Sequence, residues 1–513
     1  MRKQVLFPLI VMLLAAKFAL DTVADTDLFW HLRLGADMLE KGVLPTKVLY
    51  TWTFEGDWPP FDWLSQLFMA LAFRPFGYVS LALAKALLAA LLGLCIYRAA
   101  FLRADGNANA AALTAAAMVF AAAGNLSTRP LLLGHLFLAA EVLLLEELRR
   151  GASTKLVLLF PPLFILWGNC HGSWPIGLLP LGTALASARL PIRLKFWRPI
   201  SSDLLAFGTP KRPRKSAGLK SQDILGWCPA FLKNRLLNKP RRGLMLLLLA
   251  VCLCAPLCQL LTPAPLKFLT RPFLWTLGGT EALMDESLAV PLSHPSFWIL
   301  AVLGVVSLGL SATSRLPRIT LFDALAFLLT FVLACMHFRM MACFAVIGAP
   351  VLSGLLAPRL RDGGFEHGSR NFLFAALAAL VLGGICALSA LKAPASAATQ
   401  VPAALIDRLA ASDLGQQRGF NYFDWGGYLV LRKVPTFIDG RLEPFAASGV
   451  FETYLAIERS GDAARLEQQD VRWVLTQAGL PLADALRQRP GWTLSDEDEG
   501  IGAELWVRGE AQP

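Results

Sequence analysis

Long apolar stretches, separated by short polar connections, dominate the first 391 residues of the chain. A run of about 18 or more mainly apolar residues can cross the hydrocarbon core of a bilayer as an α-helix. The pattern predicts about eleven such helices, at residues 4–21, 78–100, 109–124, 131–147, 155–168, 174–189, 243–262, 296–313, 320–336, 341–357 and 371–391. Some of these segments are short and could be re-entrant. The expected fold class is a mostly α, polytopic membrane protein.

Beyond residue 400 the pattern changes to that of a soluble domain. Residues 392–402 contain the Ala and Pro of a linker. Helical patterns then alternate with strand-like runs, with helices expected at 402–412 and 461–469 and strands at 436–438, 471–475 and 503–507. Asp439 and Arg441 are expected to pair with each other in a turn after a strand. The sequence therefore predicts a transmembrane domain at 1–391 and a small α/β domain at 400–513.

Positive charge alternates from one connection to the next, and this alternation orients the predicted helices. With the N-terminus in the cytoplasm, the connections that fall inside are rich in Lys and Arg, above all a basic loop at 190–242. The connections that fall outside are acidic, and the first of them spans 21–77. The first apolar run is interpreted as an uncleaved helix. This topology predicts that the C-terminal domain lies outside, which is the periplasm if the cell is Gram-negative.

Composition argues against several other classes of protein. Only 17% of residues are charged, against about 25% in soluble proteins. The net charge of +11 is explained by cytoplasmic loops, and without a base-reading motif nucleic acid is not an expected partner. The nine cysteines lie mostly in apolar runs and form no disulfide framework. The six histidines form no spaced ligand pair, so zinc is not expected.

The predicted outer loop at 21–77 is rich in functional side chains. An amphipathic helix is expected at 28–41 and a second short helix at 61–73. Asp25 and Asp27 lie just past the first membrane helix, where the head group of a lipid-linked substrate would lie. One carboxylate could act as general base toward an acceptor hydroxyl, and the other could orient it or help to hold a divalent cation, Mg²⁺ or Mn²⁺. The alternative is a helix cap, for which Asp27 is well placed.

Other polar side chains on the predicted outer face are candidates for substrate binding. A donor phosphate needs cations, and Arg339 and Arg129 lie at the outer ends of helices. The alternative for both is extension of a long side chain to the membrane interface. His171 is a third candidate for the phosphate, and a structural histidine is its alternative. The candidates for binding the acceptor or the sugar are His31, Arg33, Asp62 and Asn169.

Three stretches resemble a group of bacterial multi-spanning proteins placed among the GT-C glycosyltransferases, the class that includes oligosaccharyl-, mannosyl- and arabinosyltransferases. The stretches are Asp25-Thr-Asp27-Leu-Phe-Trp30-His31-Leu-Arg33-Leu-Gly35, then Leu166-Trp-Gly-Asn169-Cys-His171-Gly172, and last Trp425-Gly-Gly-Tyr-Leu429 with Phe437-Ile-Asp439-Gly-Arg441. They are spread over nearly the whole chain. The resemblance is specific for the group and weak for a reaction, because many members have no assigned activity.

This resemblance implies a GT-C fold, an active site in an outer groove over the membrane helices, and a sugar on a polyprenyl phosphate as donor. In that class an Asp of the first outer loop is the catalytic base, a place that Asp25 or Asp27 matches. Asp25 is preferred, because Asp27 doubles as a cap. Members of the group often carry His-Glu-Trp-Leu where this chain has Phe61-Asp62-Trp63-Leu64, so the carboxylate is kept and the His is missing.

The expected function is therefore inverting sugar transfer from a polyprenyl-phosphate donor to a cell-envelope glycan, lipid or protein acceptor. Two alternatives come from other classes. A transporter of lipid-linked glycans would carry ionisable residues inside its membrane helices, and few are found here. A non-catalytic envelope assembly protein would depend on residues 400–513 and tolerate loss of the outer carboxylates.

Overall fold

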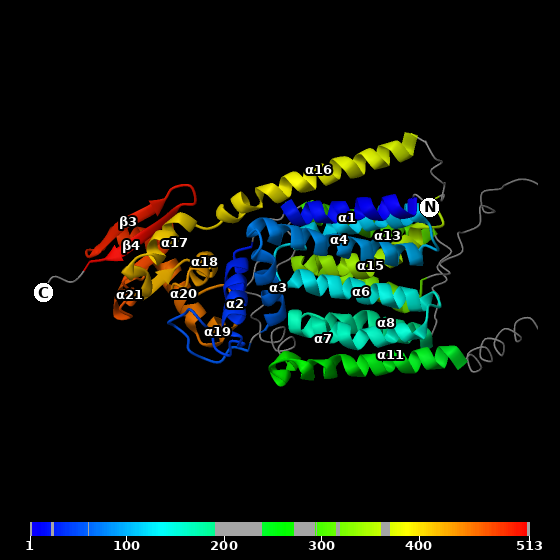
Figure 1. Ribbon diagram of the computed structural model, residues 1–513, viewed down its shortest axis with the longest axis horizontal. Helices are drawn as coiled ribbons and strands as arrows, with labels where there is room; N and C mark the ends of the chain where they lie inside the picture. Colours follow the sequence, from blue (N-terminus) through cyan, green and yellow to red (C-terminus); the bar gives the residue numbers. More distant parts are fainter. Residues whose placement is uncertain are drawn as a thin grey trace, which may run out of the picture.

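The computed structural model describes residues 3–21, 25–59, 61–189, 239–270, 293, 295–313, 319–360 and 370–509. Nearly all of the predicted basic loop at 190–242 lies outside these ranges. The described part is mostly helical, with a small sheet close to the C-terminus. The N-terminus and the sheet lie at opposite ends of the molecule (Figure 1).

Eleven helices of the described chain coincide with the eleven predicted apolar segments. They are α1 (Lys3–Asp21), α4 (Tyr78–Arg103), α5 (Ala108–Ala122), α6 (Leu131–Arg149), α7 (Phe160–Cys170), α8 (Leu178–Arg189), α11 (Lys239–Leu257), α13 (Pro295–Thr313), α14 (Leu321–Met336), α15 (Met341–Leu356) and α16 (Arg370–Ala398). Short 3₁₀ turns extend several of them, including η1 (Ala123–Asn125) and η8 (Phe338–Met340). The helices lie roughly parallel in one bundle (Figure 1).

Three helical segments of the described chain are long and apolar enough to cross a membrane. They are Tyr78–Arg103, Ala108–Asn125 and Phe338–Leu356. Most of the remaining bundle helices contain shorter apolar stretches, such as Leu321–Met336. The expected number of membrane crossings therefore stays a prediction.

Small side chains fill the contacts between the central helices of the bundle. Ala19 of α1, Ala89 of α4, Ala111 of α5 and Ala345 of α15 are each fully buried. Small residues let helix backbones approach closely, which is the usual way that helices pack where water does not drive them together. Large apolar side chains such as Leu380 point outward instead. This distribution is the one expected of a bundle that faces lipid.

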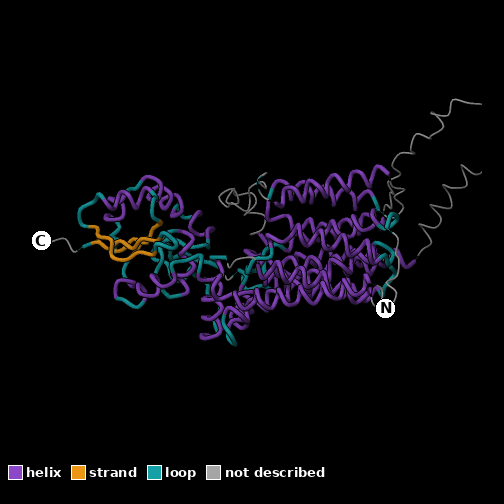
Figure 2. Tube along the Cα trace, turned by 90° about the horizontal axis from the view of Figure 1, so that it is seen from above, coloured by secondary structure: helices purple, strands orange, loops and turns teal. Residues whose placement is uncertain are grey.

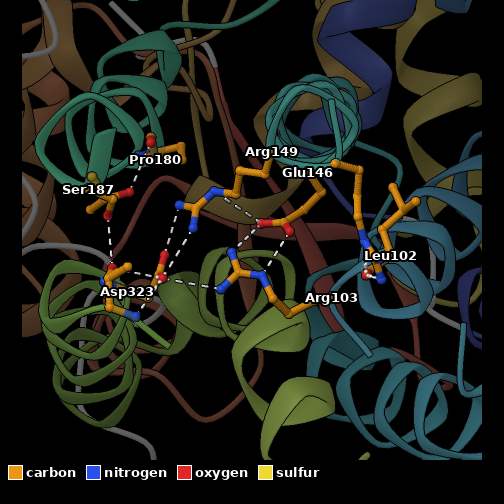
Figure 3. Close-up of polar contacts among 10 residues, drawn as sticks. Leu102, Arg103, Glu146, Arg149, Pro180, Ser187 and Asp323 are labelled. Atoms are coloured by element: carbon orange, nitrogen blue, oxygen red, sulfur yellow. Dashed lines mark hydrogen bonds and ion pairs between the residues drawn. The ribbon is translucent and has the colours of Figure 1, made fainter. Parts of the chain in front are cut away.

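Buried charges form a network at the end of the bundle where α4 and α6 finish and α14 begins (Figure 3). Nε of Arg103 donates to Oε2 of Glu146 at 2.8 Å, and its Nη1 donates to Oδ2 of Asp323 at 3.2 Å. Arg149 donates to both oxygens of Asp323, at 3.1 and 2.8 Å. Asp323 also forms a capping box with Thr320 at the start of α14. The network therefore joins the ends of three helices.

The C-terminal region contains a four-stranded sheet with helices on both sides (Figure 2). Its strands are β1 (Gly419–Asn421), β2 (Trp473–Gln477), β3 (Trp492–Asp498) and β4 (Ala503–Arg508), in the order β1-β2-β4-β3. β1 pairs with β2 in parallel and the other neighbours are antiparallel. Its helices are α17 (Ala403–Ala410), α18 (Gly426–Leu431), α19 (Leu442–Ala447), α20 (Val450–Ser460), α21 (Ala463–Gln468) and α22 (Pro481–Arg487).

Several local predictions for this region need correction. The expected linker at 392–402 is helical as far as Ala398, because α16 continues through it. The expected strand at 436–438 is a single bridge between Thr436 and Thr51 of the outer loop. The strands at 471–475 and 503–507 are confirmed as β2 and β4, whereas β1 and β3 were not predicted.

The connection at 21–77, which the sequence predicts to be the first outer loop, packs between the bundle and the sheet. Its two predicted helices are confirmed as α2 (Asp27–Lys41) and α3 (Trp63–Phe73). Between them, Trp58 and Phe61 lie in the same buried cluster as Phe437 and Phe420 of the C-terminal region. Nε1 of Trp52 donates to the carbonyl oxygen of Gly419, the first residue of β1, at 2.9 Å. The loop therefore supplies part of the core on which the sheet rests.

Candidate functional site

Asp25 and Asp27 lie at the start of α2, where the chain leaves the bundle. Oδ1 of Asp25 accepts the backbone N–H of Asp27 at 3.0 Å. Thr26 occupies the N-cap position of α2, and Asp27 is the first residue of the helix. The expectation that Asp27 acts as the cap is therefore wrong. The carboxylate that accepts a backbone N–H at this helix start belongs to Asp25, because it precedes the first turn.

Arg129 brings the two carboxylates together from a distant part of the chain. It lies in the connection between α5 and α6, which ends at the same side of the bundle as α1. Its Nη2 donates to Oδ1 of Asp25 at 2.9 Å, and its Nε pairs with Oδ2 of the same residue. The same Nη2 lies 3.3 Å from Oδ2 of Asp27. One guanidinium therefore holds both carboxylates through its fixed fork of donors.

Lys85 adds a second cation to this group. It lies near the start of α4, is 6% exposed, and interacts electrostatically with Asp25. The sequence shows it only as a lone charge within an apolar helix. Burying a lysine in such a helix is energetically costly unless a group of opposite charge pairs with it. This cost is the signal by which the sequence could have marked Lys85 as a site residue.

The C-terminal region contacts Asp27 directly. Nε1 of Trp30 donates to Oδ1 of Asp27 at 3.1 Å. A Cβ placed on Gly440 would lie 1.8 Å from the same Oδ1, so only glycine leaves room for the carboxylate here. A Cβ on Gly427 would lie 2.4 Å from the carbonyl oxygen of Thr26. Two glycines of the C-terminal region thus allow the start of α2 to lie against it.

The predicted pair of Asp439 and Arg441 is confirmed. Both side chains are fully buried, and Nε of Arg441 donates to Oδ1 of Asp439 at 2.8 Å. Nη2 of Arg441 also donates to the carbonyl oxygen of Leu49 at 2.7 Å. The guanidinium lies 6.0 Å from the centre of the Trp30 ring, within the range of a cation–π contact.

His31 lies in the same group, on the buried side of α2. It is 4% exposed, and its Nδ1 lies 3.3 Å from Nε2 of Gln66 in α3. Burial, followed by the charges of Arg129, His171 and Arg441, holds the pKa of His31 well below its usual range. His31 is therefore neutral at pH 7 and can offer a hydrogen bond to a substrate without adding charge.

His171 and Asn169 hold the turn after α7. The backbone N–H of Ser173 donates to Nδ1 of His171 at 3.1 Å. Oδ1 of Asn169 accepts Nε1 of Trp63 at 2.8 Å. These contacts give both residues structural partners. His171 still lies close enough to His31 to lower its pKa, so it belongs to the same group of side chains.

Arg33 and Asp62 have other surroundings. Arg33 is paired with Asp37 at the next turn of α2 and with Glu40, and Tyr50 donates to the same Asp37 at 2.6 Å. Within the described residues no contact joins Arg33 to the carboxylates of Asp25 and Asp27. Asp62 precedes α3 with a left-handed backbone, φ 58°, and interacts electrostatically with the Cys170 thiol.

Arg339 lies in η8, at the same end of the bundle as Arg129. The ring of Phe338 lies against Gly124 of η1, and Oδ1 of Asn125 accepts the backbone N–H of Ala342 at 3.2 Å. The turn that carries Arg339 therefore packs on the turn that leads to Arg129. The two arginines come from adjacent turns of the bundle end.

No group of three or more His, Cys, Asp or Glu side chains suited to a metal ion occurs in the part of the chain that the structure describes. Arg129 already pairs with both Asp25 and Asp27. Two carboxylates that share a guanidinium are poor ligands for a divalent cation, since the cation would meet a like charge. The residues present do not fit the expected Mg²⁺ or Mn²⁺.

No protein-family model and no curated relative matches this sequence. The fold is similar to solved structures. The oligosaccharyltransferase of Archaeoglobus fulgidus, with a tethered acceptor peptide that contains the NVT sequon, has a TM-score of 0.52 at 12% identity, over 91% of this chain and 68% of that chain. ArnT from Cupriavidus metallidurans, bound to undecaprenyl phosphate, has a TM-score of 0.48 at 13% identity, over 97% of this chain and 96% of that chain.

A second structure of the archaeal oligosaccharyltransferase AglB, in complex with an inhibitory peptide and a dolichol-phosphate, has a TM-score of 0.49 at 12% identity. It covers 91% of this chain and 69% of its own. The chain thus has a GT-C-like fold, as the three sequence stretches predicted. At this identity the likeness defines the fold, and the reaction has to be argued from the site.

Proposed function

We propose that this chain is a membrane glycosyltransferase of the bacterial inner membrane. It moves a sugar from a polyprenyl-phosphate donor to a cell-envelope glycan, lipid or protein acceptor on the outer face. The observation that carries the proposal is the pair Asp25 and Asp27, held by Arg129 at the bundle end that faces the C-terminal region. The N-terminus lies in the cytoplasm and the C-terminal region in the periplasm, because Lys and Arg gather in the connections at the opposite end.

The contacts favour Asp27 over Asp25 as the general base. Asp25 uses both oxygens on Arg129 and one of them also on the backbone of Asp27. A carboxylate bound in this way is already committed to holding the guanidinium and the start of the helix. Asp27 has a longer contact to Arg129 and is held by an indole N–H. Asp27 would accept the proton of the acceptor hydroxyl while Asp25 fixes the guanidinium.

Cations beside the carboxylates would stabilise the leaving phosphate. As the acceptor oxygen bonds to the anomeric carbon, the bond from that carbon to the phosphate oxygen breaks and the phosphate keeps the electron pair. Lys85, Arg129 and Arg339 come from three helix ends around this place. Positive groups fixed in advance stabilise such developing charge strongly. In-line attack inverts the anomeric carbon. His31 is the best placed of the proposed sugar-binding residues, because it is buried and neutral beside Trp30.

The test is transfer by the purified full-length protein in proteoliposomes, with a panel of polyprenyl-phosphate sugars. Asp27→Asn keeps the size of the side chain and removes the base, so we expect a loss of about 100-fold or more in transfer. Glu55→Gln is the matched control, because Glu55 is an exposed carboxylate of the same loop. Full transfer by Asp27→Asn would remove the assignment of Asp27 as the base, and full transfer by Asp25→Asn as well would remove both candidates.

One observation favours the transporter as a second candidate. Glu141 of α6 is fully buried, and neither of its carboxylate oxygens has a hydrogen-bond partner among the described residues. An ionisable residue at such depth is a usual mark of a transport path. The test measures whether the protein moves a fluorescent lipid-linked glycan across the membrane of proteoliposomes. Movement that is lost when Glu141 is replaced, together with no sugar transfer to any acceptor, would favour transport over glycosyl transfer.

A further inference from the structure

The segment Asp439–Gly440–Arg441 lies far from α2 in the sequence and next to it in space. Asp439 and Arg441 are fully buried and paired, and Arg441 reaches back to Leu49 of the outer loop. The amide of Asn421 fixes the approach to this segment. Its Oδ1 accepts the backbone N–H of Phe437 at 2.9 Å, and its Nδ2 donates to the carbonyl of Ile438 at 2.8 Å. The segment is therefore held in place on both sides.

This rigid segment faces the carboxylate of Asp27. Gly440 leaves the space that Oδ1 of Asp27 occupies, and the Arg441 guanidinium lies over the Trp30 ring. Trp30 in turn donates its indole N–H to the same Oδ1. The orientation of one carboxylate thus depends on three residues, two of which belong to the C-terminal region.

We infer that Gly440 and Arg441 are positioning residues for the reaction, and that the C-terminal region sets the orientation of the Asp27 carboxylate. The inference rests on the proposed function, in which Asp27 is the base. Gly440 determines how closely the Asp27 carboxylate can approach the segment. Arg441 determines the position of the Trp30 indole, which holds that carboxylate. A misplacement of about 1 Å at a reacting group can cost about 100-fold in rate, so this contact can control turnover without touching the substrate.

The first test of the geometry measures stability and needs no activity assay. It is a double-mutant cycle on the unfolding temperature of the full-length protein. Gly440→Ala brings a methyl group onto Oδ1 of Asp27, so its unfolding temperature should fall. If Asp27 is the group displaced, Asp27→Ala should restore most of that loss in the double variant. Neighbouring residues in contact show such non-additive effects, whereas independent sites add. Gly500→Ala is the control, because its new Cβ would make only an ordinary contact with Asp498. It should leave the unfolding temperature unchanged, both alone and in combination with Asp27→Ala. Additive losses would overturn the inference while leaving the proposed function intact.

The second measurement is sugar transfer by the same variants. Gly440→Ala and Trp30→Phe should each lower kcat by about 100-fold with little change in KM for the donor, since neither changes the proposed phosphate contacts. Arg441→Lys keeps the charge and loses the fork that pairs with Asp439, and should lower kcat in the same way. A rise in KM at constant kcat would overturn a positioning role. A third outcome is full transfer by Asp27→Ala while the stability effects of Gly440→Ala and Asp27→Ala remain non-additive. The contact would then be real, but Asp27 would not be the base, and the inference would fall with the proposed base.

Discussion

Arg129 and Asp25 form an ion pair across 104 residues of sequence, with Nη2 of Arg129 2.9 Å from Oδ1 of Asp25. The same nitrogen lies 3.3 Å from Asp27. A single side chain from the connection between α5 and α6 therefore holds the start of α2 to the bundle. Because it pairs with two carboxylates and its charge acts on His31, its loss would change both the shape and the charge of the candidate site.

Arg129→Gln should lower sugar transfer by about 100-fold or more and weaken the binding of undecaprenyl phosphate. The reason is that Gln keeps some hydrogen bonds to the carboxylates and supplies no positive charge for the phosphate. Transfer is measured in proteoliposomes and lipid binding by native mass spectrometry. Arg74→Gln is the control, since Arg74 is an exposed arginine at the end of α3. Unchanged binding and transfer in Arg129→Gln would contradict the role of Arg129.

The buried charge network should matter for stability far more than an exposed ion pair at the same end of the bundle. Arg103→Gln leaves Glu146 and Asp323 short of a buried partner, which costs about 3–5 kcal/mol. Arg98→Gln removes a largely exposed pair with Glu147, for which about 0–1 kcal/mol is expected. Unfolding temperatures of the two variants in detergent provide the comparison. Equal small shifts would show that the network does not hold the helix ends together.

Glu458 should make the C-terminal region less stable as the pH rises. Burial raises the pKa of this carboxyl to about 7, and the nearby Tyr454 hydroxyl opposes the rise only in part. Between the ordinary pKa of 4.5, which the unfolded chain has, and pH 7, the folded state binds more protons than the unfolded state. The free energy of unfolding therefore falls as the pH rises through this window.

Glu458→Gln removes this dependence, because its amide stays neutral at every pH. The variant should match the native protein in unfolding temperature near pH 5 and exceed it near pH 8. Glu452→Gln is the control, since Glu452 is an exposed carboxylate on the same helix α20. Tyr422, Asp424 and Tyr454 surround Glu458 and are unchanged in both variants. A difference between the variant and the native protein that grows toward acidic pH would contradict the expected direction.

The helices of the bundle could be predicted from the sequence because each follows from a local pattern. An apolar run of sufficient length determines a helix wherever its partners lie, and the helices α2 and α3 were visible in the same way. The helix ends were less certain, since the Ala-rich stretch around Pro394 has the composition of a linker and continues α16. The short strand β1 offered only three residues, too few for an alternating pattern to show.

The contacts of the site could be predicted only in part. The two carboxylates are separated by a single residue in the sequence, and the resemblance pointed to both. Arg129 was one of two candidate arginines, and nothing local shows that its turn contacts the start of α2. Lys85 was a stray charge for the same reason. Contacts between residues far apart depend on how the helices pack, and a single sequence carries no record of those pairings.

The interleaving of the first outer loop with the C-terminal region has a consequence for biogenesis. Trp52, Trp58 and Phe61 are synthesised hundreds of residues before Phe420 and Phe437, which they contact or with which they share a buried cluster. Until then the apolar side chains of the loop lack these partners. The start of α2 likewise meets Gly427 and Gly440 only after that part of the chain has been made. A chain interrupted before this point would lack the contacts that surround Asp27.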